Sequence, residues 1–184
     1  MEISIDQIRA IAPGSTPEAF FPFINPSFIR FGLKTPSAIG AWVANVAIES
    51  ANFKRTLEFA SGEAYEGRKD LGNVILGDGP KFKGRGLIQL TGRNIYRECS
   101  RAIYGNECLL ITPSLLESPE AAVLSACWYF QSREILQICN EPETWSRDAK
   151  YNKIQYIRLR INGGQNDIGP VTECYERARK ILNF

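Results

Sequence analysis

The chain has 184 residues, of which 44% are hydrophobic, 11% aromatic and 23% charged. These values are typical of a globular protein and not of a disordered or fibrous one. The length suits one domain with a substantial core. The sequence contains no histidine, which excludes Ser-His-Asp and Cys-His catalysis and histidine-ligated zinc sites. A net charge of +2 does not indicate a nucleic-acid partner. A hydrolase of this composition must use carboxylates or a rarer device.

The cysteines and the N-terminal segment indicate the compartment. The five cysteines are an odd number without CxxC spacing, which predicts reduced thiols rather than a disulfide framework or a zinc site. The opening segment MEISIDQIRAIAPG has neither a basic n-region nor an apolar h-region, and no run approaches the length of a membrane span. We therefore expect a protein without a signal peptide that folds in a reducing cytoplasm.

Capping residues and apolar spacing predict a mainly helical chain. Thr35-Pro36 and Ser118-Pro119 are typical of helix starts, because proline is well tolerated at the first helical position. The predicted helices are 3–11, 17–24, 36–52, 93–104, 119–138, 151–161 and 170–182. Residues 57–90 are rich in glycine and lack a helical period, so we expect loops and a small hairpin there. Segments 67–101 and 150–184 carry an excess of basic residues, which suits either an anionic partner or an ordinary salt-bridged surface.

The predicted helix 36–52 presents a carboxylate at the edge of its apolar stripe. Ile39, Trp42, Val43 and Val46 recur at helical spacing, and Glu49 follows Val46 by three residues. Apolar surroundings would raise the pKa of such a carboxyl group, as a general acid requires. The simpler interpretation is a boundary glutamate that reaches solvent or pairs with an arginine.

Acid–base catalysis needs a second carboxylate, and Glu58, Glu63 and Glu66 follow. On one straight helix Glu49 and Glu58 would point to opposite faces, about 13 Å apart along the axis. They can share a cleft only if the helix ends near Phe53 and the chain folds back, for which the segment 61–67 is suitable. Spacing alone does not distinguish the three candidates, nor inversion from retention at the sugar carbon.

Three polar residues farther along the chain are candidates for ligand binding. If residues 88–91 are extended, Gln89 and Thr91 share one face, where they could hydrogen-bond to sugar hydroxyls, N-acetyl groups or a water; a solvent-facing strand edge is the alternative. Asn162 precedes two glycines at a predicted helix end, where it is either a cleft ligand or part of a helix terminus. The basic amphipathic helix 170–182 could contact an anionic membrane or pack on its own domain.

The motifs WVANVAIESANF, LEFASGEAYEGRKDLGN, GDGPKFKGRGLIQLTGRNIY and RINGG together resemble the family 19 glycoside hydrolases. The resemblance covers residues 38–180 and is greatest to the single-domain endolysins of phages and prophages of Gram-negative bacteria. It implies one lysozyme-like catalytic domain over residues 1–184. It also implies hydrolysis of β-1,4 bonds in peptidoglycan or chitin, with inversion and without a metal or cofactor.

By the same resemblance, Glu49 matches the general acid and Glu58 the general base that activates water. Gln89 and Thr91 match cleft residues that hold substrate and water, and Asn162 matches an asparagine that contacts the sugar. The family often has histidine before the acid, where this chain has Ile48. The order of residues in TGRNIY also departs from the family pattern, so no role is carried over to Asn94.

These observations predict a monomeric endolysin that degrades peptidoglycan and does not bind nucleic acid. It would remain in the host cytoplasm until a separate event opens the membrane and releases it to the cell wall. Three alternatives stay open: a chitinase with the same chemistry, a wall-binding module without catalysis, and a one-acid enzyme that forms an anhydro product.

Overall fold

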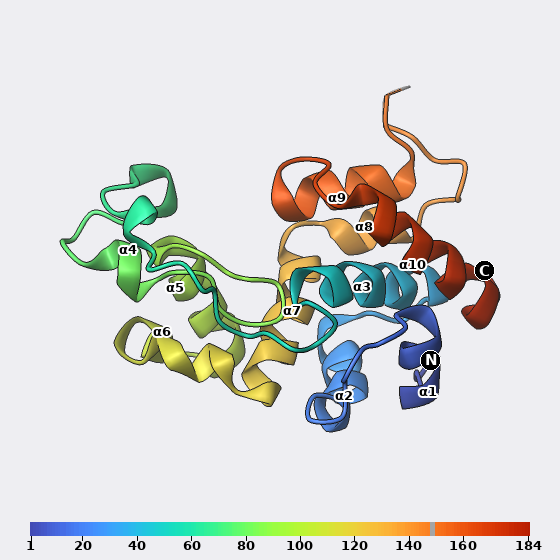
Figure 1. The fold of residues 1–184 in the computed structure, drawn as a ribbon, viewed down its shortest axis with the longest axis horizontal. Helices are drawn as coiled ribbons and strands as arrows, with labels where there is room; N and C mark the ends of the chain where they lie inside the picture. Colours follow the sequence, from blue (N-terminus) through green and yellow to red (C-terminus); the bar gives the residue numbers. More distant parts are fainter. Residues whose placement is uncertain (148–149) are drawn as a thin grey trace.

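The molecule has a larger helical part and a smaller part rich in loops, which lie side by side along its longest axis (Figure 1). The computed structural model describes residues 1–147 and 150–184. The α-helices are α1 (Ile5–Ile11), α2 (Phe21–Phe31), α3 (Pro36–Glu49), α4 (Asp78–Lys81), α5 (Arg93–Tyr104), α6 (Cys108–Ile111), α7 (Pro119–Ser132), α8 (Ile135–Cys139), α9 (Lys153–Asn162) and α10 (Ile168–Leu182). Short 3-10 helices span Glu63–Tyr65, Lys69–Leu71 and Pro113–Glu117. The predicted mainly helical fold is confirmed.

Helix α3 is the centre of the larger part. The Thr35 side chain accepts a hydrogen bond from the backbone N–H of Ala38, and Pro36 occupies the first turn, so the helix starts where the sequence predicts. Residues 37–47 are all buried, and α1, α7, α8, α9 and α10 pack around them. The helix is therefore enclosed on every side, whereas the sequence indicated a single apolar stripe.

Helix α10 packs against α3 and α1, and this contact decides the position of its apolar side. Val171, Cys174, Tyr175, Ala178 and Leu182 are buried. A side chain at Gly40 of α3 would place its Cβ 2.9 Å from the Cβ of Ala178, so the two helices meet closely. The apolar side of the predicted helix 170–182 thus packs on its own domain, as one of the two interpretations has it, and contact of the helix with an anionic membrane stays a prediction. Among the described residues, no helix is long and apolar enough to cross a bilayer.

Two predicted helix boundaries are wrong, each because tertiary packing overrides a local signal. The helix predicted at 17–24 is displaced to α2, which contains Pro26, buries Ile24 and Phe28, and packs against α7. The helix predicted at 119–138 is divided into α7 and α8 by Glu134, whose φ of 58° is left-handed. This break turns the apolar residues of α8 toward α3 and α9. Helix α6 and the 3-10 helix Pro113–Glu117 were not predicted.

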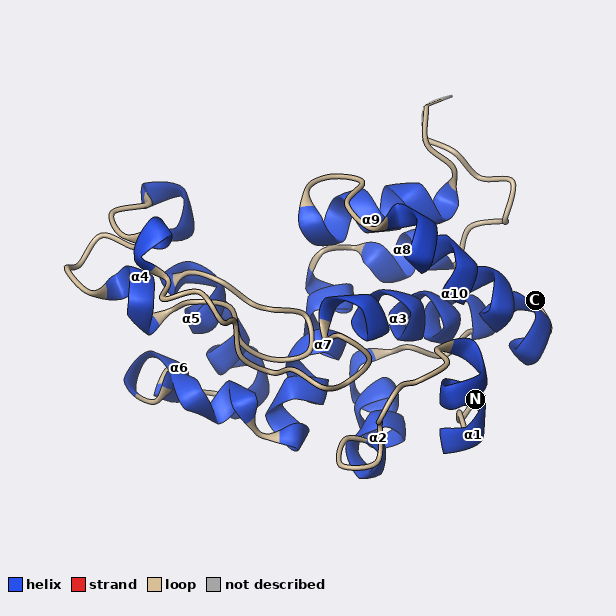
Figure 2. Cartoon of the chain, viewed as in Figure 1, coloured by secondary structure: helices blue, strands red, loops and turns tan. Residues whose placement is uncertain are grey.

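The smaller part contains α4, α5 and α6 together with the glycine-rich segment (Figure 1). Figure 2 shows long loops between the two parts, and in the described residues β-structure is limited to the isolated bridges Leu57–Arg85 and Arg85–Leu90. The expected hairpin is therefore reduced to single pairs centred on Arg85. All five cysteines are free thiols, as the sequence predicts.

Candidate active site

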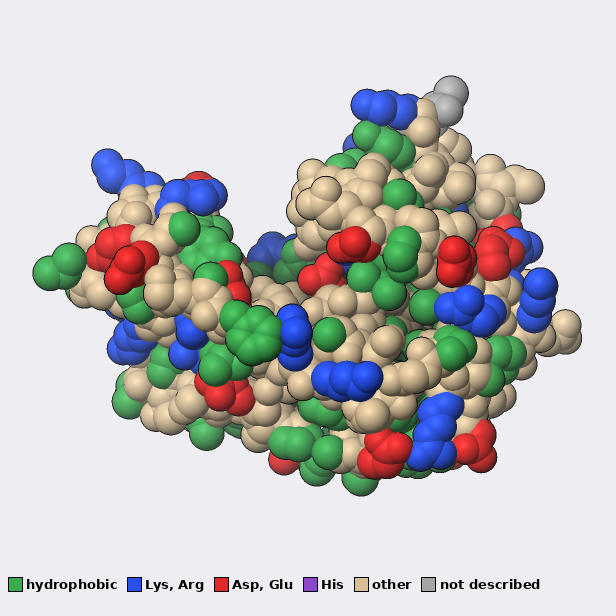
Figure 3. Space-filling view, in the orientation of Figure 1, with side chains coloured by type: hydrophobic (Ala, Val, Ile, Leu, Met, Phe, Trp, Pro, Cys, Tyr) green, Lys and Arg blue, Asp and Glu red, His purple; other side chains and the backbone are tan. Residues whose placement is uncertain are grey.

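The surface is hollowed between the two parts of the molecule (Figure 3). Glu49, Arg55, Leu57, Glu58, Phe59, Ala60 and Gln89 line a cavity of about 290 Å³, which we call the carboxylate cavity. A second cavity of about 520 Å³ is lined by Gln89, Thr91, Arg133 and Asn162 among others, and we call it the adjoining pocket. Gln89 belongs to both, so the two cavities meet at this side chain.

Glu49 is the last residue of α3, and its side chain is 18% exposed. Its Oε1 lies 2.5 Å from Nη1 of Arg158, whose side chain is only 2% exposed. Arg158 comes from α9, and its Nε donates to the carbonyl oxygen of Asn166 at 2.8 Å. The guanidinium group therefore holds the Glu49 carboxylate in a fixed position relative to the larger part of the molecule.

The expectation that Glu49 is surrounded by apolar groups is wrong. Its Oε1 is in direct contact with the charged guanidinium of Arg158. The simpler interpretation of the sequence, a boundary glutamate paired with an arginine, describes this contact correctly.

The chain reverses direction immediately after Glu49. Ala51, Asn52 and Phe53 have φ values of 50°, 63° and 63°, a left-handed run that costs roughly 1–2 kcal/mol for each residue with a side chain. The Ser50 hydroxyl donates to the carbonyl of Val46 at 2.7 Å and accepts from the N–H of Phe53 at 2.8 Å. Buried Phe53 then packs near Trp42, with ring centroids 6.3 Å apart. These contacts offset the strain, and the return occurs earlier than the predicted segment 61–67.

Glu58 is held by the smaller part of the molecule. Its Oε1 accepts from the Tyr65 hydroxyl at 2.9 Å, and its Oε2 accepts from the backbone N–H of Gly84 at 2.9 Å. The backbone N–H of Glu58 in turn donates to the carbonyl of Gly84 at 3.0 Å. Burial, together with the hydrogen bond to Glu58, raises the pKa of Tyr65, so the phenol remains a donor. Two donors thus fix both oxygens of this carboxylate.

Glycine is required at position 84 because the backbone approaches two of the candidate side chains. A Cβ there would lie 2.8 Å from Oε1 of Gln89 and 3.0 Å from Oε2 of Glu58. Any larger residue would therefore displace one of these groups. The close approach of the backbone to these side chains therefore explains why position 84 of the glycine-rich segment is a glycine.

The structure separates the three candidates for the second carboxylate. Glu58 lines the same cavity as Glu49. Glu66 instead accepts from the N–H groups of Gly77 and Gly79, each at 2.7 Å, and so anchors the loop that leads into α4. Glu63 is exposed on a 3-10 helix. Of the three, only Glu58 can act together with Glu49 in the carboxylate cavity.

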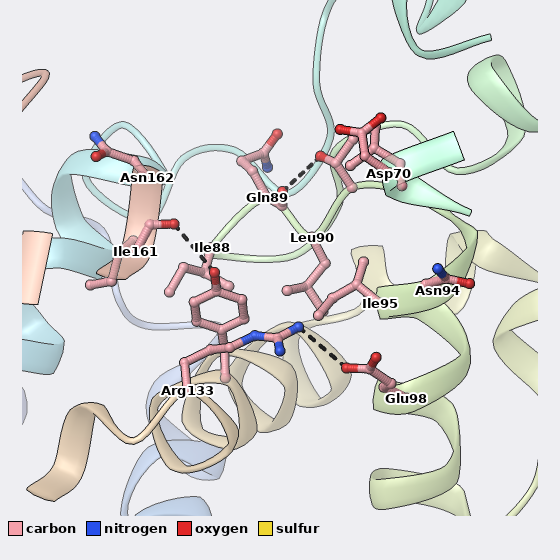
Figure 4. Close-up of a pocket in the computed structure, with 13 residues that line it drawn as sticks. Asp70, Ile88, Gln89, Leu90, Asn94, Ile95, Glu98, Arg133, Ile161 and Asn162 are labelled. Atoms are coloured by element: carbon pink, nitrogen blue, oxygen red, sulfur yellow. Dashed lines mark hydrogen bonds and ion pairs between the residues drawn. The ribbon is translucent and has the colours of Figure 1, made fainter. Parts of the chain in front are cut away.

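Gln89 and Asn162 lie around the adjoining pocket (Figure 4). Thr91 lines the same pocket. The predicted extended conformation of residues 88–91 is wrong, because Gln89 has a left-handed φ of 54°. Arg85 and Leu90 close a tight turn through two backbone hydrogen bonds of 3.1 and 2.9 Å. Gln89 and Thr91 nevertheless reach the same pocket, and the Thr91 hydroxyl donates to the Gln89 carbonyl at 3.0 Å.

Asn162 also takes part in local structure. It ends α9, and its Oδ1 accepts from the N–H of Gly164 at 2.9 Å, while Nδ2 donates to the Asn166 carbonyl at 3.3 Å. The helix-terminus interpretation is therefore correct for this side chain, and its position at the pocket leaves it accessible to a ligand. No observation of the structure tests the assigned roles of the five candidate residues, which stay predictions.

Sequence reasoning missed the residues that hold the two carboxylates. Arg158 lies one helical turn before Asn162 in a predicted helix, but its sequence neighbours do not reveal that it is buried. Tyr65 follows Glu58 by seven residues without a recognisable motif. In the part of the chain that the structure describes, no group of three or more Cys, Asp or Glu residues is placed to hold a metal ion.

Comparison with known proteins shows what the chain is similar to. No family model matches the chain. A Haemophilus influenzae protein described as containing a glycosyl hydrolase family 19 domain is 29% identical over 129 residues. The alignment covers 70% of this chain and 56% of that protein, so the chain spans little more than half of the relative's length.

Solved structures give a match over nearly the whole chain. Chitinase C from Streptomyces griseus HUT6037 has a TM-score of 0.67 at 20% identity, covering 98% of this chain and 76% of that one. The fold is that of the family 19 glycoside hydrolases. A bacterial family 19 chitinase gives a TM-score of 0.68 at 17% identity, with 98% and 94% covered. A family 19 class IV chitinase from Zea mays gives 0.68 at 18%, with 95% and 85% covered. The family 19 resemblance of the sequence is thereby confirmed.

Proposed function

We propose that the protein is a glycoside hydrolase that cleaves β-1,4 bonds between N-acetyl amino sugars by inverting acid–base catalysis. The observation that carries this proposal is the meeting of Glu49 and Glu58 in one cavity. The family 19 relative and the chitinase neighbours support a glycoside hydrolase. In this reaction Glu49 protonates the glycosidic oxygen, and a water activated by Glu58 attacks the opposite face of the sugar.

The surroundings of the two carboxylates suit these different tasks. Glu58 accepts hydrogen bonds from Tyr65 and Gly84, and these two donors hold its oxygens in place, as positioning of a water requires. The cavity volume of about 290 Å³ is several times the roughly 30 Å³ that one water occupies in the liquid. Gln89, Thr91 and Asn162 supply the polar groups that would hold an N-acetyl sugar beside the attacking water.

We favour peptidoglycan as the substrate. The protein would then act as an endolysin that lyses the host in which it is produced. The similarity of the motifs to family 19 endolysins and the basic segments 67–101 and 150–184 support this choice. An endolysin of this kind would stay in the cytoplasm until the membrane is opened. A chitinase is the second candidate, because the similar solved structures are chitinases.

Product analysis tests these proposals. The purified protein is incubated with peptidoglycan and with chitin oligomers, and the fragments are identified by mass spectrometry. Reducing-end muropeptides from peptidoglycan would support the endolysin, whereas activity confined to chitin would support the chitinase. Anhydro products, which contain one water less, would contradict hydrolysis. Binding to the wall without new reducing ends would support a binding module without catalysis. A new reducing end that is first formed as the β-anomer would contradict inversion.

A further inference from the structure

The side chains of Arg55 and Phe59, a cation and an aromatic ring, lie in contact on the wall of the carboxylate cavity. The guanidinium carbon of Arg55 lies 4.2 Å from the centroid of the Phe59 ring, and both residues line the cavity beside Glu58. The Phe59 side chain is 80% exposed, so its ring is accessible from the cavity. The pair therefore presents an apolar surface and a positive charge to whatever enters the cavity.

Arg55 differs from the other arginines of the cleft in its partners. Arg158 is bound to Glu49, and in the adjoining pocket Arg133 is paired with Glu98 at 3.2 Å (Figure 4). Among the described residues no carboxylate lies within 4.0 Å of the Arg55 guanidinium, whose side-chain contact is the Phe59 ring. Its hydrogen-bond donors remain available to a ligand, and an exposed cation–π contact of this kind holds the guanidinium in place.

The two candidate polymers differ in the group that could use these donors. Chitin is a chain of uncharged N-acetyl sugars, whereas peptidoglycan carries peptides with free carboxylates on alternate sugars. A guanidinium matches a carboxylate with two parallel hydrogen bonds, and an aromatic face covers the apolar surface of a sugar or of an aliphatic side chain. A neutral substrate would leave the Arg55 charge without a partner.

We propose that Arg55 and Phe59 are specificity-determining residues that bind the carboxylate-bearing peptide substituent of peptidoglycan and so favour this polymer over chitin. The proposal rests on the proposed glycoside hydrolase function. It assigns Arg55 to the charge of the substituent and Phe59 to the apolar surface next to it. Neither residue is among those matched to the family 19 motif for sugar binding.

The test compares kcat/KM for soluble peptidoglycan fragments that retain their peptides with kcat/KM for chitin oligomers. The variants are Arg55→Gln, Arg55→Lys and Phe59→Ala, with Lys54→Gln as the matched control, because Lys54 is exposed and cationic but does not line the cavity. We expect Arg55→Gln to lower the ratio of kcat/KM for peptidoglycan to kcat/KM for chitin about tenfold, as for loss of a charge-assisted pair. Arg55→Lys should lower it less, Phe59→Ala about threefold, and Lys54→Gln should leave it unchanged.

Two results would overturn the inference while the proposed function stands. One is an Arg55→Gln variant whose kcat/KM is unchanged on both polymers. The other is an equal loss on both polymers, which would assign Arg55 to the chemistry and not to specificity. A wild-type protein that cleaves neither polymer would instead overturn the proposed function, and one that cleaves chitin alone would remove the peptidoglycan assignment together with the inference. Thermal unfolding of each variant checks that the fold is retained.

Discussion

The larger and the smaller part of the molecule hold their chain segments in different ways. The larger part packs around α3, where Trp42 is fully buried and its ring centroid lies 5.0 Å from that of Phe28 in a T-shaped contact. The smaller part also buries apolar rings, such as Phe82, but its loops are fixed by hydrogen bonds and an ion pair of the buried Asn73 and Asp78. Each part supplies one candidate carboxylate, so the site combines a packed helix end with a hydrogen-bonded loop.

This difference has a functional consequence. Glu49 is set by a helix whose position depends on packing, and Arg158 reaches it from a second helix of the same part. Glu58 depends on Tyr65, which ends a short 3-10 helix, and on Gly84, which lies in a loop. Substitutions of residues packed around α3 should therefore change stability first, whereas substitutions of the groups that hold the two carboxylates should change the geometry of the site.

The largest expected effect is on catalysis, from Glu49→Gln. Glutamine has nearly the same shape but cannot donate the proton that the leaving group needs. We expect kcat to fall about 10⁴-fold, or roughly 5 kcal/mol in the barrier, at the upper end for loss of an acid catalyst. The measurement is turbidity loss of permeabilised Gram-negative cells or cleavage of chitin oligomers, with circular dichroism as the control for folding. A rate near wild type would reject the role of Glu49.

The apolar core of the larger part is tested by Trp42→Ala. Removing this buried side chain should lower the free energy of unfolding by about 4 kcal/mol, because the cavity cannot close fully. Trp42→Phe is the matched control: it keeps an aromatic ring and removes an indole N–H that is buried without a hydrogen-bond partner in the described structure, so its cost should be much smaller. Equal costs for the two variants in urea unfolding would contradict the packing argument.

The same contrast explains which parts of the fold could be predicted. Apolar spacing and capping residues predict the positions of α3, α5, α9 and α10 to within a few residues. The reason is that the position of a helix and its buried face follow from the spacing of apolar residues near in sequence. The displaced start of α2 and the break at Glu134 depend on contacts with distant helices. No single sequence pattern encodes such contacts.

The site residues that belong to a recognisable sequence motif could be predicted, and the others could not. The family resemblance led to Glu49, Glu58, Gln89, Thr91 and Asn162, and the structure brings these residues to two cavities that meet at Gln89. It did not lead to Arg158 or Tyr65, nor to the left-handed residues 51–53 that reverse the chain. These features arise from the folded arrangement of residues that are distant in sequence.

The polar framework of the smaller part should make it sensitive to acid. Asp78 is buried, accepts from the N–H of Ile75 at 3.0 Å and forms an ion pair with Arg93, whose Nε lies 2.8 Å from Oδ2. The Arg93 guanidinium holds the pKa of Asp78 below its usual range. Since the folded-state pKa is lowered, this carboxylate contributes stability above its unfolded pKa of about 3.9. That stability is lost as the pH falls through the lower folded value.

Asp78→Asn isolates this contribution. At neutral pH the variant should be less stable by about 3 kcal/mol, because it leaves the Arg93 charge poorly compensated. Its free energy of unfolding should also depend less on pH below about 4 than that of the wild type, since one linked proton is removed. Asp6→Asn, which changes an exposed carboxylate, is the control. Parallel pH profiles for wild type and Asp78→Asn would contradict the assignment.

A smaller effect is expected from Arg158→Lys. Lysine keeps the positive charge but cannot hold Glu49 and the Asn166 carbonyl at the same time in a fixed fork. We expect kcat to fall about tenfold with little change in KM, which corresponds to about 1.4 kcal/mol. A variant that raises KM alone would show that Arg158 serves substrate binding and does not position Glu49.

The smallest predicted effect, from Tyr65→Phe, tests whether the loop positions Glu58. Phenylalanine keeps the ring and removes only the hydroxyl that donates to Oε1, so Glu58 retains the N–H of Gly84. Loss of one hydrogen bond of about 1 kcal/mol should lower kcat about fivefold. Tyr104→Phe, at a partly exposed position of α5, should leave kcat unchanged. A Tyr65→Phe variant with the kcat of the wild type would mean that Glu58 keeps its position without this hydroxyl.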